Sequence, residues 1–197
     1  MSLLLAPHIP TGLPIFDEGP GHRNTCPGLP KGRMTLVRGA EGQGKSMVAM
    51  KAAANLQAAG LRVGYLDLNG NCSPERMVSL GLHPGEASFI LMQPLDIQGV
   101  LEACTCLIPI TDVLFLDGLR VESALEWDAP LALLKQAVAS GIALVVLGTH
   151  FPVAWKFHSH RFYDLHSFRA PGTITFWTWK DAFCIRDGKE RTFGIRP

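Results

Sequence analysis

The amino-acid sequence predicts an α/β fold, with a mostly parallel central sheet flanked by helices and a C-terminal antiparallel hairpin. Three observations carry this prediction. Strand-like and helix-like segments alternate from Arg33 to Leu147, as they do around open parallel sheets. The run from Ile142 to Leu147 is unbroken in apolar residues, which is typical of a strand buried on both faces. From Thr173 onward, aromatic and polar residues alternate instead, which predicts an antiparallel hairpin that turns at Asp187-Gly188.

The first half of the chain opens with a Pro- and Gly-rich stretch, residues 7–32, that leads into a short strand from Arg33 to Arg38. After a Gly-rich loop, the residues from Ser46 to Ala59 are dense in Ala, Met, Lys and Leu. They stop before Gly60, which predicts a helix with a glycine beyond its C-terminus. The apolar pattern then predicts a second strand at Leu61–Leu68.

The second half continues the alternation of helices and strands. Periodicity predicts helices at Pro74–Leu80, Ile97–Leu107 and Ala129–Ala139. It predicts strands at Ala87–Met92 and Thr111–Asp117, which join the parallel sheet. Neither an internal repeat nor a low-complexity tract is present.

Length and charge limit the classes of function. A chain of 197 residues suffices for one well-buried domain, so we expect a single domain over residues 1–197. Its 18 Lys and Arg nearly balance its 17 Asp and Glu. A net charge of +1 gives almost no long-range attraction for phosphates, so a nucleic-acid role would need a local basic patch.

Cysteines and apolar segments bear on the compartment. The 5 cysteines show no CxxC pair, which predicts neither a disulfide framework nor a zinc site, and we expect reduced thiols. The start of the chain lacks the basic region and long apolar run of a signal peptide. Apolar stretches stay far below the ~20 residues that span a bilayer. We therefore expect a soluble cytoplasmic protein with no membrane partner.

The Gly-rich loop has a phosphate-binding pattern. It fits GxxxxGK[ST], follows a predicted strand and opens a predicted helix. In such a P-loop, backbone N–H groups surround the phosphates, Lys45 reaches the β- and γ-phosphate oxygens, and Ser46 ligates Mg²⁺. The sequence therefore predicts binding of ATP, or a related nucleoside triphosphate, with Mg²⁺. The predicted nucleotide-binding residues here are Gly39, Glu41, Gly42, Gln43, Gly44, Lys45, Ser46 and Met47.

A second pattern supplies a metal-binding carboxylate. Four apolar residues, from Val113 to Leu116, precede Asp117. This is the form of a Walker B strand, whose acidic residue holds Mg²⁺ or its water at the carboxyl edge of the sheet. Such runs are also common in the cores of α/β proteins, and the upstream P-loop favours the metal-binding interpretation. Ser46 and Asp117 are therefore the predicted metal residues.

Four further segments lie in order along the chain. Ile9–Asp17 carries an "IPTG…LD" pattern, and Gly28–Arg33 a "GLPxGR" pattern. The stretch from Tyr65 to Arg76 resembles "YIDTEG…RPER", and Gln93-Pro94 precedes a helix and the Walker B strand. Together these segments, over about residues 9–120, resemble the ATPase core of the RecA/RadA recombinase superfamily.

The resemblance implies a RecA-like P-loop NTPase fold in three parts. These are a leading segment at residues 1–32, a nucleotide-binding core at residues 33–150, and a DNA-binding loop with the terminal hairpin at residues 151–197. The chain resembles a minimal core of the recombinase-paralogue or phage annealing-protein type.

Residues after the second core strand acquire roles from this resemblance. Arg76 would lie against the adenine, where its flat guanidinium can stack; otherwise it is a solvated arginine at a helix end. Asn69 stands where the family has its catalytic glutamate, and an amide cannot act as a general base. Asp67, two residues earlier on the same side of a strand, is one alternative carboxylate. Glu41 of the P-loop is another; the simpler interpretation of Glu41 is a surface glutamate that only faces solvent. The implied activity is a DNA-dependent ATPase, with weak or altered hydrolysis.

His150 follows the last core strand, where family members carry a polar sensor of the γ-phosphate. As a sensor it would donate a hydrogen bond to the phosphate, and as a structural residue it would only cap the strand end. The catalytic residues implied by the resemblance are Lys45, Asp67, Asn69 and His150.

The segment from Phe151 to Tyr163 is basic and aromatic together, and it corresponds to the mobile DNA-binding loop of recombinases. Cations suit the backbone of single-stranded DNA, and rings stack on its bases. The rival interpretation is an ordinary loop whose aromatic side chains pack under the sheet. Part of Arg161 to Arg169 would then already belong to the next strand. The predicted DNA-binding residues are Trp155, Lys156, Phe157, His158, His160 and Arg161.

Two cations of the predicted hairpin complete the set of predicted nucleotide-binding residues. Lys180 matches the first lysine of a family pair that reaches the γ-phosphate of a neighbouring subunit, and the second position is Ala182. Arg186, or Lys189, would take the place of that second lysine; the simpler alternative is that these cations are only solvated. A site completed by a neighbour implies a homo-oligomer, either a ring or a filament.

The leading hypothesis is an ATP-binding protein of DNA recombination, repair or single-strand annealing. An alternative is a nucleotide-gated regulatory or scaffold module similar to KaiC-type domains or inactive paralogues, which Asn69 favours. A second alternative is a hexameric helicase-like motor, which His150 favours and the missing glutamate opposes. A small-molecule kinase ranks last, because Gly118 to Trp127 is too short and too poor in arginine for a lid.

Overall fold

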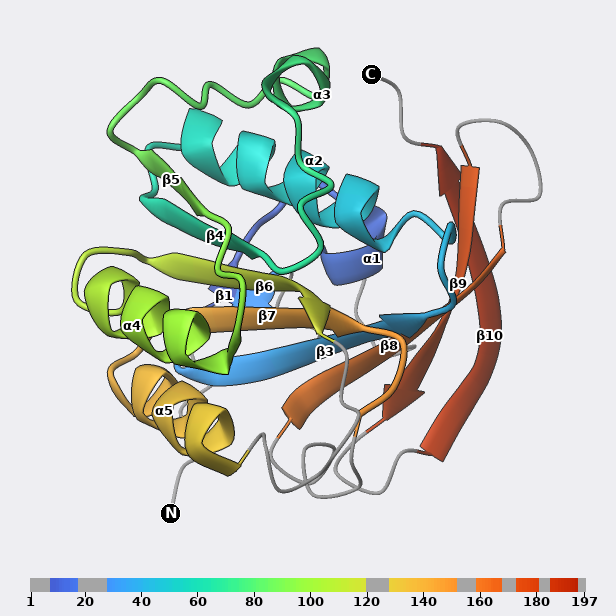
Figure 1. The fold of residues 1–197 in the computed structure, drawn as a ribbon. Helices are drawn as coiled ribbons and strands as arrows, with labels where there is room; N and C mark the ends of the chain where they lie inside the picture. Colours follow the sequence, from blue (N-terminus) through green and yellow to red (C-terminus); the bar gives the residue numbers. More distant parts are fainter. Residues whose placement is uncertain are drawn as a thin grey trace.

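A computed structural model describes residues 8–17, 28–119, 128–151, 159–167, 173–180 and 185–194. Within these residues, an 8-stranded sheet has the strand order β10-β9-β8-β3-β7-β6-β4-β5 (Figure 1). The strands from β8 to β5 run parallel, and β9 and β10 extend the sheet in antiparallel pairing. The predicted α/β fold with a mostly parallel sheet and an antiparallel C-terminal hairpin is confirmed.

The described elements lie close to their predicted places. The strands are β1 (His8–Ile9), β2 (Leu29–Pro30), β3 (Arg33–Gly39), β4 (Val63–Asp67), β5 (Phe89–Met92), β6 (Val113–Leu119), β7 (Ala143–Gly148), β8 (Ser159–Ser167), β9 (Thr173–Lys180) and β10 (Ile185–Gly194). The helices are α1 (Pro14–Asp17), α2 (Lys45–Ala58), α3 (Pro74–Ser79), α4 (Ile97–Leu107) and α5 (Asp128–Ala139).

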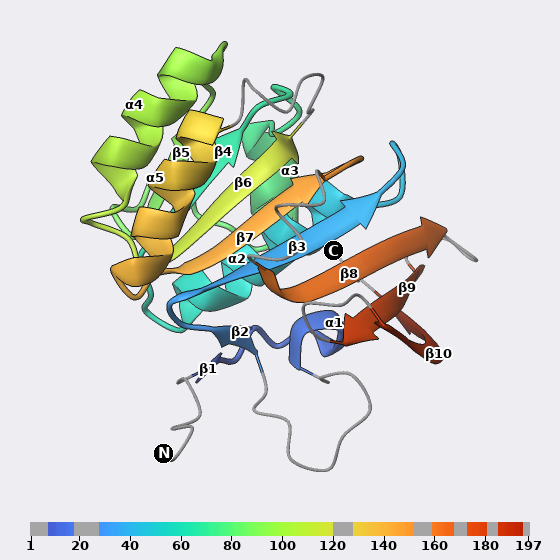
Figure 2. The same cartoon turned by 90° about the horizontal axis from the view of Figure 1, so that it is seen from below.

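Apolar cores lie on both faces of the sheet. α1 and α2 cover one face, and α4 and α5 cover the other (Figures 1 and 2). Val37 packs into the first core and its neighbour Leu36 into the second, because successive side chains of a strand point to opposite faces. β6 is buried at every position, from Val113 to Leu119. This double covering explains why the central strands read as continuous apolar runs.

The segment before β3 is fastened to the helix that follows the P-loop. The backbone N–H of Thr11 and its hydroxyl donate to the Asp17 carboxylate at 2.9 and 2.8 Å, and the Gly12 N–H donates to it at 2.7 Å. Asn55 of α2 donates from Nδ2 to the Thr11 carbonyl at 2.7 Å. The "IPTG…LD" pattern therefore describes a small cap that packs against α2.

The predicted hairpin turn at Asp187-Gly188 is wrong. Backbone pairing runs Ile185 to Lys180 and Arg186 to Trp179, and then resumes at Glu190 to Trp177. Asp187 and Gly188 therefore lie inside β10 at an irregularity of the ladder, where a glycine often marks a bulge. The residues that join the two strands are 181–184.

The predicted loop from Phe151 to Tyr163 ends earlier than expected, and the strand that the sequence allowed within Arg161 to Arg169 already begins at Ser159. β8 begins at Ser159 and pairs in parallel with β3, so that Phe162 lies opposite Leu36. His160 and Arg161 therefore belong to a strand of the sheet. Residues 152–158, which contain Trp155, Lys156, Phe157 and His158, lie outside the described residues.

Two smaller predictions concern thiols and membranes. In the described ranges, Cys72, Cys104 and Cys106 are free thiols. The helices of these same ranges include no segment long and apolar enough to cross a membrane.

Candidate functional site

The P-loop joins β3 to α2 at the carboxyl edge of the parallel strands. Gly42 and Gly44 have φ angles of 77° and 79°, a left-handed conformation that side chains with a Cβ disfavour. α2 begins after Gly44 with no side-chain cap on its first N–H groups. The loop therefore has the backbone form in which N–H groups at a helix start surround an anion.

Lys45 closes this loop from inside. Its Nζ donates to the carbonyls of Gly39 and Ala40 at 2.7 and 2.8 Å. The Gln43 side chain adds a second closure, because its Oε1 accepts the Ala40 N–H at 2.8 Å. Burial lowers the pKa of Lys45, while the charges of Asp117 and Glu41 oppose that change. A half-buried ammonium of this kind suits an anionic partner, such as a phosphate.

Asp117 and Ser46 form the oxygen pair of the site. Asp117 ends the apolar part of β6 and is 2% exposed. It accepts hydrogen bonds from the Ser46 hydroxyl and from the Tyr65 phenol, the latter at 2.7 Å. Burial raises the pKa of Asp117, and those two hydrogen bonds oppose the rise. The predicted metal residues Ser46 and Asp117 are therefore in direct contact, and both supply the oxygen ligands that Mg²⁺ prefers.

Asp67 has a different use. It is buried, and its carboxylate accepts the N–H groups of Asn69 at 3.2 Å and Cys72 at 2.8 Å, and Nε2 of Gln93 at 3.0 Å. Burial favours a higher pKa for Asp67, but the hydrogen bonds from Gln93 and the backbone outweigh it and the pKa is lowered. A carboxylate held in this way is a poor general base. Asp67 instead shapes the loop after β4.

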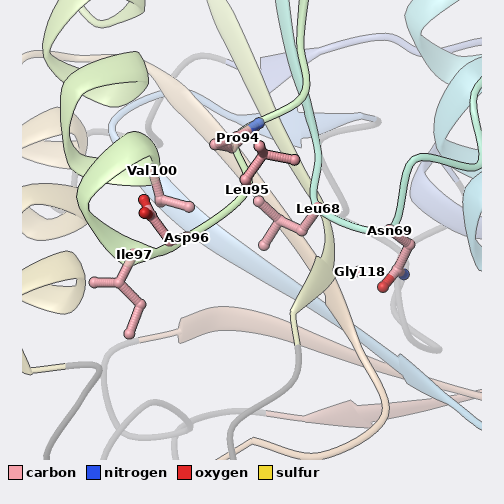
Figure 3. Close-up of a pocket in the computed structure, with 8 residues that line it drawn as sticks. All are labelled: Leu68, Asn69, Pro94, Leu95, Asp96, Ile97, Val100 and Gly118. Carbon is pink, nitrogen blue, oxygen red and sulfur yellow. The ribbon is translucent and has the colours of Figure 1, made fainter.

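Asn69 lies beside the Walker B strand. Gly118, the residue after Asp117, has a φ angle of 94°, and a Cβ added to it would collide with the Asn69 amide. Figure 3 shows Asn69 and Gly118 together at one side of a pocket at the carboxyl edge. The pocket is lined by Leu68, Asn69, Pro94, Leu95, Asp96, Ile97, Val100 and Gly118. Asn69 therefore stands next to the metal pair but faces a mostly apolar pocket.

A separate cavity opens along the P-loop itself. It is lined by Gly42, Gly44, Lys45, Ser46, Met47, Asn71 and Arg76. Met47 and Arg76, two of the predicted nucleotide-binding residues, thus line the cavity beside the P-loop. Asn71 is a lining residue that the sequence analysis missed, because no family pattern marks its position. The signal that was available is its place in a polar turn directly after a core strand.

His150 lies on the other side of the loop. It is exposed after β7, and with Thr149 it lines a pocket that also contains Glu41 and Gln43. The structure therefore brings His150 to the P-loop. Thr149 and His150 also share this pocket with Arg38, Gly39, Ala40 and Leu165.

The hairpin cations lie far along the sheet from the P-loop. β9 is antiparallel to β8, and the register pairs Phe162 with Trp179 and Ser167 with Thr175. Lys180 and its neighbour in register, Ile185, are therefore at the amino edge, opposite to the edge that carries the P-loop. Arg186 pairs with Trp179 at the same end. Within one chain these two cations and the P-loop are not brought together.

Comparisons with known proteins give partial matches in sequence and a match in fold. No family model matches the chain. Protein RecA of Mycobacterium avium (strain 104) is 35% identical over 112 residues, which are 56% of this chain and 30% of that protein. Protein RecA of Mycobacterium marinum is 36% identical over 100 residues, 51% of this chain and 27% of that protein. The matched part thus spans less than a third of the length of these curated relatives.

A solved structure is similar over most of the chain. The crystal structure of the RadB recombinase superposes with a TM-score of 0.68 at 22% sequence identity. The match covers 86% of this chain and 90% of that one. At this level of sequence identity, the structural similarity shows the fold alone.

Proposed function

We propose that this chain, which has a RecA/RadA-superfamily core, is a single-domain ATP-binding protein that acts on single-stranded DNA in recombination, repair or annealing, as a homo-oligomer. The observation that carries the proposal is the contact between Ser46 and Asp117 beside the P-loop cavity. A loop of this form binds phosphates through backbone N–H groups, and the Ser–Asp pair supplies hard oxygen ligands for Mg²⁺.

The donor set fits Mg²⁺ with a nucleotide. In the described part of the chain, no group of three or more His, Cys, Asp or Glu side chains is arranged to hold a metal. Mg²⁺ is commonly bound by one or two protein oxygens together with phosphates and water. Ser46 and Asp117 would hold the ion, and Lys45 would exchange the carbonyls of Gly39 and Ala40 for phosphate oxygens. The ion would neutralise charge that develops on the phosphates.

Weak or altered hydrolysis is part of the proposal. Asn69 has an amide where a general base is needed, and Asp67 is engaged by the loop that it orders. Glu41 is an exposed carboxylate on the P-loop, in the pocket that also contains His150. His150 is well situated to donate a hydrogen bond to a γ-phosphate.

Contact with single-stranded DNA rests on the composition of the segment after His150 and on the similarity to proteins named RecA. Rings and cations alternate there, as in sites that stack bases and neutralise the backbone. We assign contacts to Trp155, Lys156, Phe157 and His158, and further contacts to His160 and Arg161 at the start of β8.

Oligomer formation is supported by the place of Lys180 and Arg186. Both are remote from the P-loop of their own chain, so their proposed contact with a nucleotide requires a second copy. Such a head-to-tail contact builds a ring or a filament.

Binding measurements with a Lys45→Ala control test the proposal. The wild-type chain should bind Mg·ATP and then retain a fluorescent oligo-dT at low salt, and it should sediment as a larger species with ATP than without. Lys45→Ala should lose all three responses. ATP binding without any change in DNA retention or mass would instead favour the regulatory module, for which the Asn69 amide is the supporting observation.

A further inference from the structure

The cavity along the P-loop is lined by two chemically different groups of residues. Gly42, Gly44, Lys45 and Ser46 offer backbone N–H groups, an ammonium and a hydroxyl, which suit phosphates. Met47, Asn71 and Arg76 offer a thioether, an amide and a guanidinium, which suit a flat polar ring. With the phosphates on the first group, the nucleoside half of the ligand faces the second.

Asn71 is held in place before any ligand arrives. Its backbone N–H donates a hydrogen bond to the Asp67 carboxylate. The backbone N–H groups of Asn69 and Cys72, in the same loop, do so as well. Gln93 braces the same carboxylate from the end of β5 at 3.0 Å. The backbone of Asn71 is thereby fixed while its side chain stays exposed at the cavity. A fixed backbone limits the positions that the Asn71 amide can reach, so less conformational freedom is lost on binding.

We propose that Asn71 reads the base of the bound nucleotide and makes the site prefer adenine to guanine. This inference rests on the proposed nucleotide-binding function and adds its specificity. An asparagine amide offers one donor and one acceptor side by side, which match the N7 acceptor and N6 donor of adenine. The same edge of guanine presents two acceptors, so one half of the amide is left without a partner.

Arg76 and Met47 contribute affinity without this choice. A guanidinium stacks on the face of either purine, and a flexible thioether packs against either ring. Removal of Arg76 should therefore weaken both nucleotides alike. Only the removal of Asn71 should change their ratio.

Calorimetric titration of the full chain with Mg·ATP and Mg·GTP tests the inference. The wild-type chain should bind ATP about tenfold more tightly than GTP, the range expected for a bidentate amide contact. Asn71→Ala should weaken ATP binding by about the same factor and bring the two dissociation constants together. Arg76→Ala should weaken both and keep their ratio. Gln98→Ala, which removes an exposed amide of α4 away from the cavity, should change neither.

The outcomes separate the inference from the function on which it rests. A wild-type chain that binds neither nucleotide refutes the proposed function. A chain that binds both equally, prefers GTP, or keeps its ATP preference in Asn71→Ala refutes the role of Asn71 and leaves nucleotide binding intact. Asn71→Leu guards against a folding defect of the alanine variant, because it keeps the approximate shape of the side chain but removes both the donor and the acceptor. It should show the same loss of preference.

Discussion

The Tyr65 phenol donates a 2.7 Å hydrogen bond to the Asp117 carboxylate, and both side chains are almost wholly buried. The bond joins β4 to β6 at the edge where the P-loop lies. Burial raises the pKa of Asp117, and the hydrogen bonds from Ser46 and Tyr65 oppose that rise. Tyr65 therefore acts as a positioning residue that favours the ionised, metal-binding form of Asp117.

Tyr65→Phe should lower the free energy of unfolding by about 1–3 kcal/mol, because it leaves a buried carboxyl short of one donor. Urea denaturation measures that change. Affinity for Mg·ATP should fall as well, since a higher pKa leaves less of Asp117 ionised. The loss of affinity should shrink as the pH is raised. A loss that is the same at every pH would contradict the role in ionisation and leave only a packing defect.

Asp67 should make the fold sensitive to acid. Its pKa in the folded chain lies below the ordinary value of 3.8, so its contribution to stability is full above that pH. The contribution is lost as the pH falls through the lowered pKa, where the folded state must take up a proton. Gln93→Ala removes one of the hydrogen bonds that lower the pKa and should move acid unfolding to higher pH. Circular dichroism during acid titration measures the midpoint of unfolding, with Gln98→Ala as the control. An unchanged midpoint in Gln93→Ala would contradict this role of Gln93.

Gly118→Ala should be among the more damaging glycine substitutions. The φ angle of 94° disfavours any Cβ, and the added methyl group would meet the Asn69 amide. We expect a loss of about 1–3 kcal/mol of stability and weaker nucleotide binding. Gly85→Ala is the matched control, because a Cβ there has no heavy atom within 4 Å. Equal thermal stability of the two variants would show that the carboxyl edge around Gly118 tolerates rearrangement.

Asn69→Glu should raise the rate of ATP hydrolysis, because it supplies a carboxylate beside Asp117 at the position of the missing base. Phosphate release with and without oligo-dT measures the gain. Asn69→Gln, equally long but without a carboxylate, should give none. A glutamate variant no faster than the wild type would mean that Asn69 does not limit the reaction.

Local signals in the sequence were sufficient for the core. The P-loop pattern, the apolar run before Asp117 and the alternation of elements depend on neighbouring residues, and the structure has all of them near their predicted bounds. The sequence allowed a strand within Arg161 to Arg169 but did not fix the start of β8, because Ser159 to Ser167 mix histidine, arginine and aspartate with apolar residues. Its strand form comes from pairing with β3, which lies more than a hundred residues earlier. Such long-range pairing overrides local propensity.

In the site too, the roles that depend on local motifs were predictable, and those that depend on distant residues were not. The roles of Lys45, Ser46 and Asp117 follow from motifs that carry their geometry with them. The full set of hydrogen bonds to the Asp67 carboxylate could not be predicted, because one donor, Gln93, comes from the connection after a different strand. Asp187-Gly188 illustrates the opposite error: a turn-like pair sits inside β10, because the flanking residues find partners on β9.

The strand that carries the P-loop, β3, has β7 on one side and β8 on the other, and both pair with it along nearly its full length. Residues 149–158 join those two flanking strands. The connection starts beside the P-loop, where Thr149 and His150 share a pocket with Gly39, and it ends at the opposite edge of the sheet, where Ser159 pairs with Met34. The strand order thus leads the chain from the edge that carries the P-loop, through the basic, aromatic segment, to the opposite edge of β3.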